Sequence, residues 1–413
     1  MAQVSLEPVT EIKVTLNFDN DPIPVGRLAL RENEIYFEYE ASFLEKGIEL
    51  SPLRLSLRPG VRKFDPRLFD GLPGVFYDCL PDGWGRLLVD RALASQGVNY
   101  RTISALDRLA CVGQSGMGAL TFLPEWDGQT TEVGDLSLDQ LSTQAEAVLA
   151  GEANDVLQDL IALNGSSAGA RPKAVIFVND DKTIIRHGSG EHEDGFEHWL
   201  VKFANTQDGP DAGAIEYVYA EMAKTAGVEM SDVHLFPAEN AAGYFATKRF
   251  DRIGSNRLHL HSACGLLHSD FRTPTLDYEE LLALTGSLTK DAREVETMYR
   301  LAVFNVLAHN RDEHSKNFSF LMDASGEWKL SPAYDLTFSS GPGGEHSSTV
   351  MGEGKSPTEE HLRRLGDAAK IDEAKVDAVI GATKDALSMW KELAVNYGVS
   401  ADNVSLIDKS LFG

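Results

Sequence analysis

The stretch His309-Asn310-Arg311-Asp312-Glu313-His314-Ser315-Lys316-Asn317 decides the fold class and the candidate chemistry of this 413-residue chain. Apolar residues recur at helical spacing in 298–308, so we expect a helix that ends just before His309. Within the stretch, Asp312 and Asn317 are separated by four residues. The loop therefore presents a carboxylate and a carboxamide at a fixed spacing after a helix.

This spacing is typical of phosphoryl transfer. The catalytic loop of protein kinases reads H-R-D-x-x-x-x-N, where the aspartate accepts the proton of the acceptor hydroxyl and the asparagine binds magnesium. Arg311-Asp312 reproduces the Arg-Asp pair and Asn317 the asparagine, whereas His309 lies one residue upstream of the pattern's histidine. Asp312 is thus the candidate catalytic base and Asn317 a candidate metal ligand. The alternative is that both are solvated loop residues that cap a helix.

A second acidic residue follows the loop in the order that this chemistry requires. Residues 328–330 predict a short strand, and Asp335 follows it as the metal-binding aspartate of the D-F-G triplet follows a strand in kinases. The triplet here reads Tyr334-Asp335-Leu336. Asp335 is therefore assigned as the second magnesium ligand by order and context, not by literal motif.

Small residues crowd the segment 164–173, which joins a predicted helix to a predicted strand. Such a loop lets backbone amides approach phosphates closely, and Arg171 or Lys173 could add positive charge. Because the segment matches neither a Walker A nor a G-x-G-x-x-G sequence, a plain connecting turn is the alternative. The candidate contacts to nucleotide phosphates are Ser167, Ala168, Gly169 and Ala170.

Lys202 lies within the apolar strand predicted over 198–203, where a cation needs an anionic partner. It suits the lysine that pairs with the α- and β-phosphates of a nucleotide, with Glu216 on the following helix as its ion-pair partner. The alternative is that Lys202 points to solvent from an edge strand and Glu216 is a surface charge. Further along, Lys248 and Phe250 belong to a candidate link between two lobes, whose backbone could meet an adenine edge.

The remaining pattern predicts an α+β protein, with a two-lobed protein kinase-like fold behind a small N-terminal α+β domain. Short strands and turns dominate 12–123, which also holds a helical segment at 85–93 with Asp82 as a plausible cap. A polar, glycine-containing stretch at 127–135 marks a boundary. The expected units are residues 1–126, a small-lobe unit with the phosphate loop at 127–252, and a mainly helical lobe with the catalytic loop at 253–413.

Short patterns within 127–252 outline the small lobe. A hairpin is expected from strands at 174–178 and 183–186, and helical spacing at 215–226 lies between strands at 198–203 and 243–250. Two short helical segments are expected before the phosphate loop, at 138–149 and 156–163. Strands, one helix and a further strand are the outline of a nucleotide-holding lobe.

Composition narrows the classes of function. The net charge of −25 would repel a phosphate backbone, so direct nucleic-acid binding over a broad face is disfavoured. Three widely spaced cysteines favour free thiols over a disulfide framework or a zinc site. The sequence has no long uncharged apolar run and no basic leader followed by an apolar segment, so we expect a cytoplasmic protein without membrane insertion.

Histidines suggest a competing idea, a transition-metal site. One set lies among acidic residues in 187–198, and His259 and His261 alternate on a predicted strand. Neither set has the spacing of a metal site, and solvated loop charges explain the first set equally well.

With these loops in order, the sequence resembles the HipA family, the serine/threonine kinase toxins of HipA–HipB toxin–antitoxin modules. The resemblance spans nearly all residues. Its most specific match is Asp312-Glu313-His314-Ser315-Lys316-Asn317-Phe318, which fits the pattern Asp-x-His-x-Lys-Asn-Phe. The other matching segments are 80–86, 116–120, 166–173, 200–202, 248–252 and 331–335.

The resemblance implies an ATP- and Mg²⁺-dependent kinase with Asp312, Asn317 and Asp335 in the functions assigned above. It also implies that Lys202 contacts ATP phosphate and that His314 and Lys316 belong to the nucleotide site.

The resemblance further implies regulation by autophosphorylation. The family's modified loop serine corresponds to Ser166, and its modification would eject the phosphate loop and silence the enzyme. Ser167 follows directly, so the modified residue stays open between the two.

The partners implied by the resemblance are a protein substrate such as an aminoacyl-tRNA synthetase and a HipB-like helix-turn-helix antitoxin. The antitoxin would supply most DNA contacts, which agrees with the acidity of this chain. Two alternatives stay open: a small-molecule phosphotransferase of related fold, and a non-catalytic co-repressor bound to the antitoxin.

Overall fold

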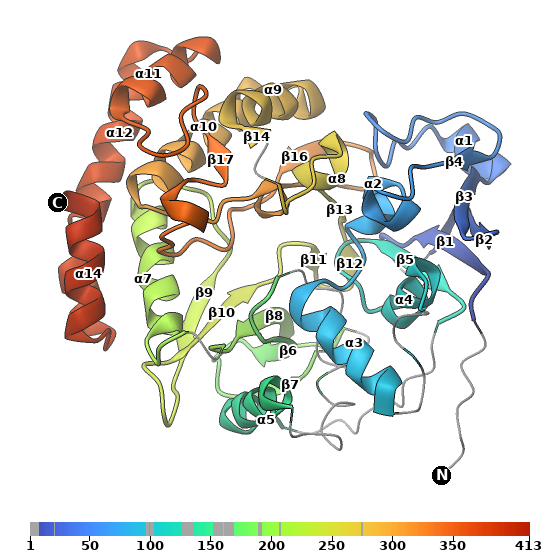
Figure 1. Cartoon of the computed structure of the whole chain (residues 1–413), viewed down its shortest axis with the longest axis horizontal. Coiled ribbons are helices and arrows are strands. Elements are labelled where there is room, and N and C mark those ends of the chain that lie inside the picture. The colour runs from blue at the N-terminus through green and yellow to red at the C-terminus, as the bar shows by residue number, and fades with distance from the viewer. Residues whose placement is uncertain are drawn as a thin grey trace.

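The computed structural model describes residues 8–19, 21–95, 99, 103–125, 135–151, 160, 169–188, 192–205, 208–273 and 276–413. Within these residues, three sheets of three or more strands follow one another, with helices packed around them and gathered toward the C-terminus (Figure 1). This mixture confirms the predicted α+β class.

The first sheet is antiparallel and has the strand order β4-β3-β2-β1-β5. Glu32 and Asn33 alone connect its second and third strands, and both have positive φ angles, which match the twist of a two-residue hairpin. The strands are β1 (Glu11–Leu16), β2 (Ile23–Arg31), β3 (Glu34–Tyr39), β4 (Arg62–Lys63) and β5 (Leu120–Leu123). The helices of this part are α1 (Ala41–Lys46), α2 (Gly74–Tyr77), α3 (Gly83–Ser95) and α4 (Ala105–Val112).

The second sheet has the order β7-β6-β8-β10-β9, and the predicted hairpin between its first two strands is confirmed by their antiparallel register. Its strands are β6 (Lys173–Asn179), β7 (Ile185–His187), β8 (Phe196–Lys202), β9 (Val233–Phe236) and β10 (Tyr244–Lys248). Two helices lie against it, α5 (Leu138–Ala150) and α7 (Ala212–Thr225). The predicted segment 156–163 lies outside the described residues, apart from residue 160.

Helix α7 forms where the sequence predicted it because its apolar residues recur three and four positions apart on one face. Val218, Tyr219 and Met222 on that face are fully buried. The helix contacts β9 and β10 on one side and two helices near the C-terminus on the other. It therefore joins the second sheet to the helical part of the chain (Figure 1).

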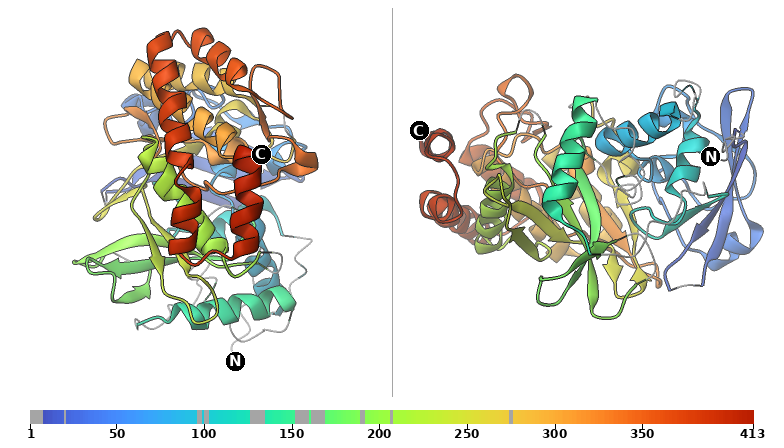
Figure 2. Two further views of the ribbon diagram at one scale, coloured as in Figure 1. Left: turned by 90° about the vertical axis from the view of Figure 1, so that its left-hand side faces the viewer. Right: turned by 90° about the horizontal axis from the view of Figure 1, so that it is seen from below.

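The C-terminal part combines helices with a small antiparallel sheet of order β13-β15-β16. The strands of this part are β11 (Arg252–Ile253), β12 (Asn256–Arg257), β13 (His259–Ser262), β14 (Leu276–Asp277), β15 (Ser319–Met322), β16 (Trp328–Leu330) and β17 (Ser348–Thr349). The helices are α8 (Ala263–Leu267), α9 (Tyr278–Thr289), α10 (Ala292–Leu307), α11 (Glu359–Ala368), α12 (Glu373–Leu387), α13 (Trp390–Asn396) and α14 (Ala401–Phe412). The last four helices lie on the side of the molecule away from the first sheet (Figure 2).

Buried apolar side chains form three clusters that do not follow the chain order strictly. Trp84 and Leu88 of α3 pack with the second sheet, although the rest of the N-terminal part packs around the first. Cys264 and Met322, from the C-terminal part, complete the first cluster. The three parts thus share side chains across their borders, and the domain limits at residues 126 and 252 stay a prediction.

No helix within the described ranges combines the length and the apolar character needed to cross a membrane.

Candidate active site

The catalytic-loop candidate follows α10, which ends at Leu307 as the sequence predicted. Asn310 fastens the start of the loop, because its side chain donates to Asn305 Oδ1 at 2.9 Å and its backbone N–H donates to Asn305 O. Asn317 fastens the end, because its Nδ2 donates to Asp312 O at 3.0 Å. The carboxylate of Asp312 is exposed at the surface of this braced loop.

Two charge environments act on this loop. Neighbouring groups displace part of the water around the Asp312 carboxylate, which raises its pKa, and the negative charge of Asp335 raises the pKa further. Glu313 is fully buried and its carboxylate bonds His346 Nδ1, while Ser348 Oγ donates to Glu313 O. The segment that contains His346 and Ser348 therefore anchors the loop through Glu313, while the neighbouring Asp312 stays exposed.

Lys202 at the end of β8 meets two acidic residues from distant parts of the chain. Its Nζ forms ion pairs with Glu216 of α7 and with Asp335 Oδ1, the latter at 2.5 Å. Burial would lower the pKa of Lys202, but the carboxylates of Asp335 and Glu216 outweigh it and raise the pKa. The ammonium is thus held charged between α7 and the segment after β16.

Asp335 is kept ionised at this junction. Burial alone would raise its pKa, but the ammonium groups of Lys202 and Lys173 lower it well below its usual range. Its backbone φ is +59°, a left-handed conformation that costs energy for any residue except glycine. The strained backbone turns an ionised carboxylate toward the lysine of the second sheet.

Two further cations lie beside this group, at positions that the sequence marked only as sources of positive charge. Arg171 bonds Glu216 Oε2 at 3.4 Å and Asp208 at 3.1 Å. Lys173 is buried at the start of β6, and burial, with the charge of Lys202, lowers its pKa to about 8. Three cations, Arg171, Lys173 and Lys202, thus lie together with the carboxylates of Asp208, Glu216 and Asp335.

Lys316 and Gly169, both assigned to the nucleotide site, meet at Asp82 instead of standing free. Asp82 Oδ2 accepts from Lys316 Nζ at 2.6 Å, and Asp82 Oδ1 accepts from the Gly169 N–H. Both oxygens of Asp82 thus have partners outside α3, the helix that this residue was expected to cap.

The other assigned residues have different partners. His314 packs its ring 5.4 Å from that of Phe271. Lys248 forms an ion pair with Glu197, and Phe250 packs 5.5 Å from the ring of Tyr334, next to Asp335. Ala170 is described, whereas Ser166, Ser167 and Ala168 lie outside the described residues.

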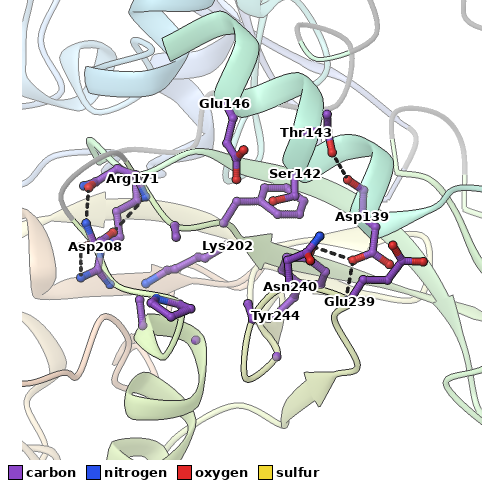
Figure 3. Close-up of a pocket in the computed structure, with 18 of the residues that line it drawn as sticks. Asp139, Ser142, Thr143, Glu146, Arg171, Lys202, Asp208, Glu239, Asn240 and Tyr244 are labelled. Atoms are coloured by element: carbon purple, nitrogen blue, oxygen red, sulfur yellow. Dashed lines mark hydrogen bonds and ion pairs between the residues drawn. The ribbon is translucent and has the colours of Figure 1, made fainter. Parts of the chain in front are cut away.

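A pocket of about 830 Å³ opens beside this group, between α5, α7 and the segment before β10. Figure 3 shows Arg171, Asp208 and Lys202 at one end and Asp139, Glu239 and Tyr244 at the other. Glu216 also lines it. The pocket thus reaches the Lys202 ion pair from the α5 side.

The two histidines of β13 that were considered for a metal site have other partners. His259 Nε2 donates to Leu50 O at 3.0 Å, and His261 bonds both Asp78 and Ser51. Among the residues that the structure describes, no group of three or more His, Cys, Asp and Glu side chains is arranged to hold a metal ion.

Sequence reasoning missed Asp82, Asp208 and Tyr334 as parts of this site. Tyr334 donates its hydroxyl to Lys316 O at 2.6 Å and thereby fixes the catalytic loop. Asp82 lies in the matching segment 80–86 and Tyr334 in the matching segment 331–335, and these segments were the available signals. Asp208 carried no signal, because a lone aspartate in a loop is ordinary.

Comparison with known proteins gives two family matches that together cover most of the chain. Residues 18–123 match the family described as the HipA N-terminal domain, and residues 165–390 match the HipA-like C-terminal domain. The Y4mE protein of Sinorhizobium fredii is 28% identical over 328 residues, which cover 74% of this chain and 72% of that protein. The serine/threonine-protein kinase toxin HipA of Shewanella oneidensis is 26% identical over 285 residues, 62% of this chain and 60% of that protein.

A solved structure shares the fold. A chain of the Shewanella oneidensis complex of HipA, HipB and operator DNA superposes with a TM-score of 0.67 at 16% identity, covering 96% of this chain and 94% of that chain. This likeness confirms the predicted kinase-like α+β fold.

Proposed function

The chain belongs to the HipA family, and we propose that it is an ATP- and magnesium-dependent serine/threonine protein kinase restrained by a HipB-like antitoxin. The observation that carries the proposal is the position of Lys202 between Glu216 and Asp335. Protein kinases need this lysine–glutamate pair and the neighbouring metal-binding aspartate together. Here the three residues come from a strand, a helix and a loop that meet only in the folded chain.

In the proposed reaction, the acceptor hydroxyl attacks the γ-phosphorus of ATP, its proton passes to Asp312, and ADP leaves. Asp312 suits this task because its raised pKa brings it closer to the working pH. Lys202 and Arg171 would neutralise phosphate oxygens, and Lys173 lies beside them.

The residues present fit a magnesium ion. The pKa of Asp335 is lowered, which favours the ionised carboxylate, and Asn317 uses Nδ2 to bond Asp312 O, so its side-chain oxygen could serve as a ligand. Hard oxygen ligands of this kind suit Mg²⁺, which takes its remaining ligands from phosphates and water. Bound there, the ion would neutralise charge that develops on the phosphate oxygens.

The proposal includes two finer statements. Ser166, or Ser167 beside it, receives phosphate from the enzyme itself, and the external substrate is a protein, for which the family suggests an aminoacyl-tRNA synthetase. The structure that shares the fold comes from a complex with HipB and operator DNA. We therefore propose a HipB-like partner that makes the DNA contacts, in keeping with the net charge of −25 on this chain.

The decisive experiment is incubation of the purified chain with labelled ATP and Mg²⁺, followed by mass spectrometry of residues 164–173. We expect label on Ser166 or Ser167 and its loss in the Asp312→Asn variant. Label that persists in this variant contradicts the mechanism. Turnover of small alcohols without any protein target would favour a small-molecule phosphotransferase, and absence of ATP binding with intact HipB binding would favour a co-repressor.

A further inference from the structure

The residues just before helix α3 contact two parts of the proposed active site, although they belong to the N-terminal part of the chain. Asp82 bonds Lys316 of the catalytic loop at 2.6 Å and the Gly169 N–H with its other oxygen. Lys316 is 234 positions away in sequence and Gly169 is 87 positions away. The carboxylate of Asp82 thus joins Lys316 of the catalytic loop to Gly169 of the phosphate-loop segment.

Gly169 is held by more than this one bond. Trp84 N–H donates to Gly169 O at 3.0 Å, so both backbone polar groups of Gly169 are bound by the start of α3. Gly83 allows the approach: a Cβ atom there would lie 2.4 Å from Gly169 O and 2.8 Å from Ala170 Cα. Its φ of +43° also disfavours any other residue. The contact is therefore a close backbone fit.

Lys316 depends on Asp82 for its charge balance. Its ammonium lies 4.9 Å from the ring centroid of Tyr77 and 4.7 Å from that of Phe271, and the residue is 7% exposed. Burial would lower its pKa, but the charge and hydrogen bond of Asp82, with the charge of Asp78 beside it, outweigh burial and raise the pKa. The same pairing neutralises Asp82, whose negative charge would otherwise repel a phosphate near Gly169.

We propose that Asp82 is a positioning residue for phosphoryl transfer: through Lys316 and Gly169 it sets the distance between the catalytic loop and the phosphate loop. This inference rests on the proposed kinase function. It gives the N-terminal domain a part in ATP binding, because the domain supplies the residue that aligns the two loops. Small displacements of such groups are enough to weaken binding and catalysis strongly.

The test compares Asp82→Asn with Asp90→Asn in the full-length chain. Asp90 lies on α3, the helix that follows Asp82, but pairs with Arg108, so its variant controls for general loss of stability. Two quantities are measured: hydrogen exchange of a peptide that begins several residues before Gly169, such as 164–176, without nucleotide, and the KM for ATP in autophosphorylation. The exchange readout does not depend on activity.

We expect Asp82→Asn to speed exchange at Gly169 and to raise the KM for ATP about tenfold, since one charge-assisted hydrogen bond is worth at least that factor. Asp90→Asn should leave both quantities near their wild-type values. Equal changes in the two variants, or no change in Asp82→Asn, overturn the inference.

A double substitution tests the pairing itself. Lys316→Met alone should weaken ATP binding because Asp82 is left as an uncompensated anion, and adding Asp82→Asn should recover part of that loss. Strictly additive effects contradict the pairing. Should Asp82→Asn fail to fold, Asp82→Glu replaces it: the charge stays but Gly169 must shift, so an unchanged KM and unchanged exchange overturn the inference.

Failure of this inference differs from failure of the proposed function. A wild-type chain that neither binds ATP nor labels itself refutes the kinase proposal. A wild-type chain that labels itself while Asp82→Asn behaves identically refutes only the positioning by Asp82.

Discussion

Lys202 shows how one residue depends on partners from distant parts of the chain in the proposed active site. A buried ammonium is costly unless it is paired, and here Glu216 and Asp335 pair it from two sides. Glu216 is 2% exposed and also bonds Arg171, so it orients both cations. Removing its charge should therefore disturb ATP binding without a direct contact to the nucleotide.

We expect Glu216→Gln to lower kcat/KM for ATP by about 10- to 100-fold, because the lost charge corresponds to roughly 1.4–3 kcal/mol of binding energy. The matched control is Glu221→Gln on the same helix, where the carboxylate is partly exposed and pairs only loosely with Lys224 at 3.9 Å. Initial rates of autophosphorylation over a range of ATP concentrations measure the effect. Equal rates in the two variants would contradict the function assigned to Glu216.

Asp312→Asn should lower kcat by about 10²- to 10⁴-fold and leave the KM for ATP nearly unchanged, because it removes a proton acceptor and no phosphate contact. Its thermal midpoint should not fall, since the raised pKa of Asp312 means that the fold disfavours its charge. The exposed Asp367→Asn on α11 serves as control. A thermal midpoint that falls clearly below those of wild type and Asp367→Asn would assign Asp312 a structural function instead.

At the scale of elements, the start of α3 lies in close backbone contact with the segment 169–170 and positions it. Helix α3 begins at Gly83, whose missing side chain lets the helix meet the segment 169–170. Helix α12 contains Gly381, where an added Cβ would meet nothing within 4 Å. An added side chain would therefore clash at Gly83 of α3 but fit freely at Gly381 of α12.

Gly83→Ala should destabilise the chain and weaken ATP binding, because its Cβ would overlap Gly169 O and its φ is positive. Gly381→Ala should instead stabilise the chain by about 0.5–1 kcal/mol through higher helix propensity. Thermal unfolding and ATP titration of both variants measure the contrast. A Gly83→Ala variant with wild-type midpoint and affinity would show that the close contact is dispensable.

At the scale of the whole molecule, buried polar groups tie the N-terminal part to the link after β10. Asp251 is fully buried, pairs with Arg249 and Arg252, and accepts from Gly118 N–H at 2.7 Å. Arg252 also donates to Gly116 O at 2.8 Å. Two segments that matched the family separately in sequence therefore form one network.

Asp251→Asn should cost about 3–5 kcal/mol of unfolding free energy, because it leaves two guanidinium groups buried without their counter-charge. The control Asp65→Asn breaks an exposed ion pair with Arg67 and should cost less than about 1 kcal/mol. Urea unfolding of both variants gives the difference. Similar losses in the two would mean that water reaches the network in the folded protein.

His259 should make stability depend on pH. It is fully buried where β13 meets the N-terminal part, and burial lowers its pKa from 6.5 to about 3. Below pH 6.5 the unfolded chain binds a proton that the folded chain rejects, so stability falls as the pH drops from 6.5 toward 3. Each pH unit in this window should lower the folding equilibrium constant by up to about tenfold.

The comparison is unfolding between pH 6.5 and 5 for wild type and His259→Gln, whose amide can still donate to Leu50 O. The variant should lose less stability than wild type across this window. His361→Gln, on the outer helix α11, should follow wild type. Parallel profiles for wild type and His259→Gln would contradict the assigned protonation.

The sequence by itself determined the local elements and the order of the chemical groups. The strand at 34–39, the helix that ends before His309 and the hairpin at 174–186 were predictable because their periodicities act over a few neighbouring residues. The family pattern around Asp312 was equally visible, since it is continuous in the chain. Strand β2 escaped because Pro24 and Gly26 interrupt its alternation, and β9 escaped because four residues carry a weak signal.

Only the tertiary structure decided which charges meet. Lys202 and Asp335 are 133 positions apart, and Lys316 and Asp82 are 234 apart, so no spacing rule could pair them. Their pairing depends on packing between sheets and helices, which buries each cation and thereby demands a carboxylate from whichever segment lies nearest. The sequence predicted where Asp312 stands in its loop, whereas the fold brought Asp82 of the N-terminal part to the same site.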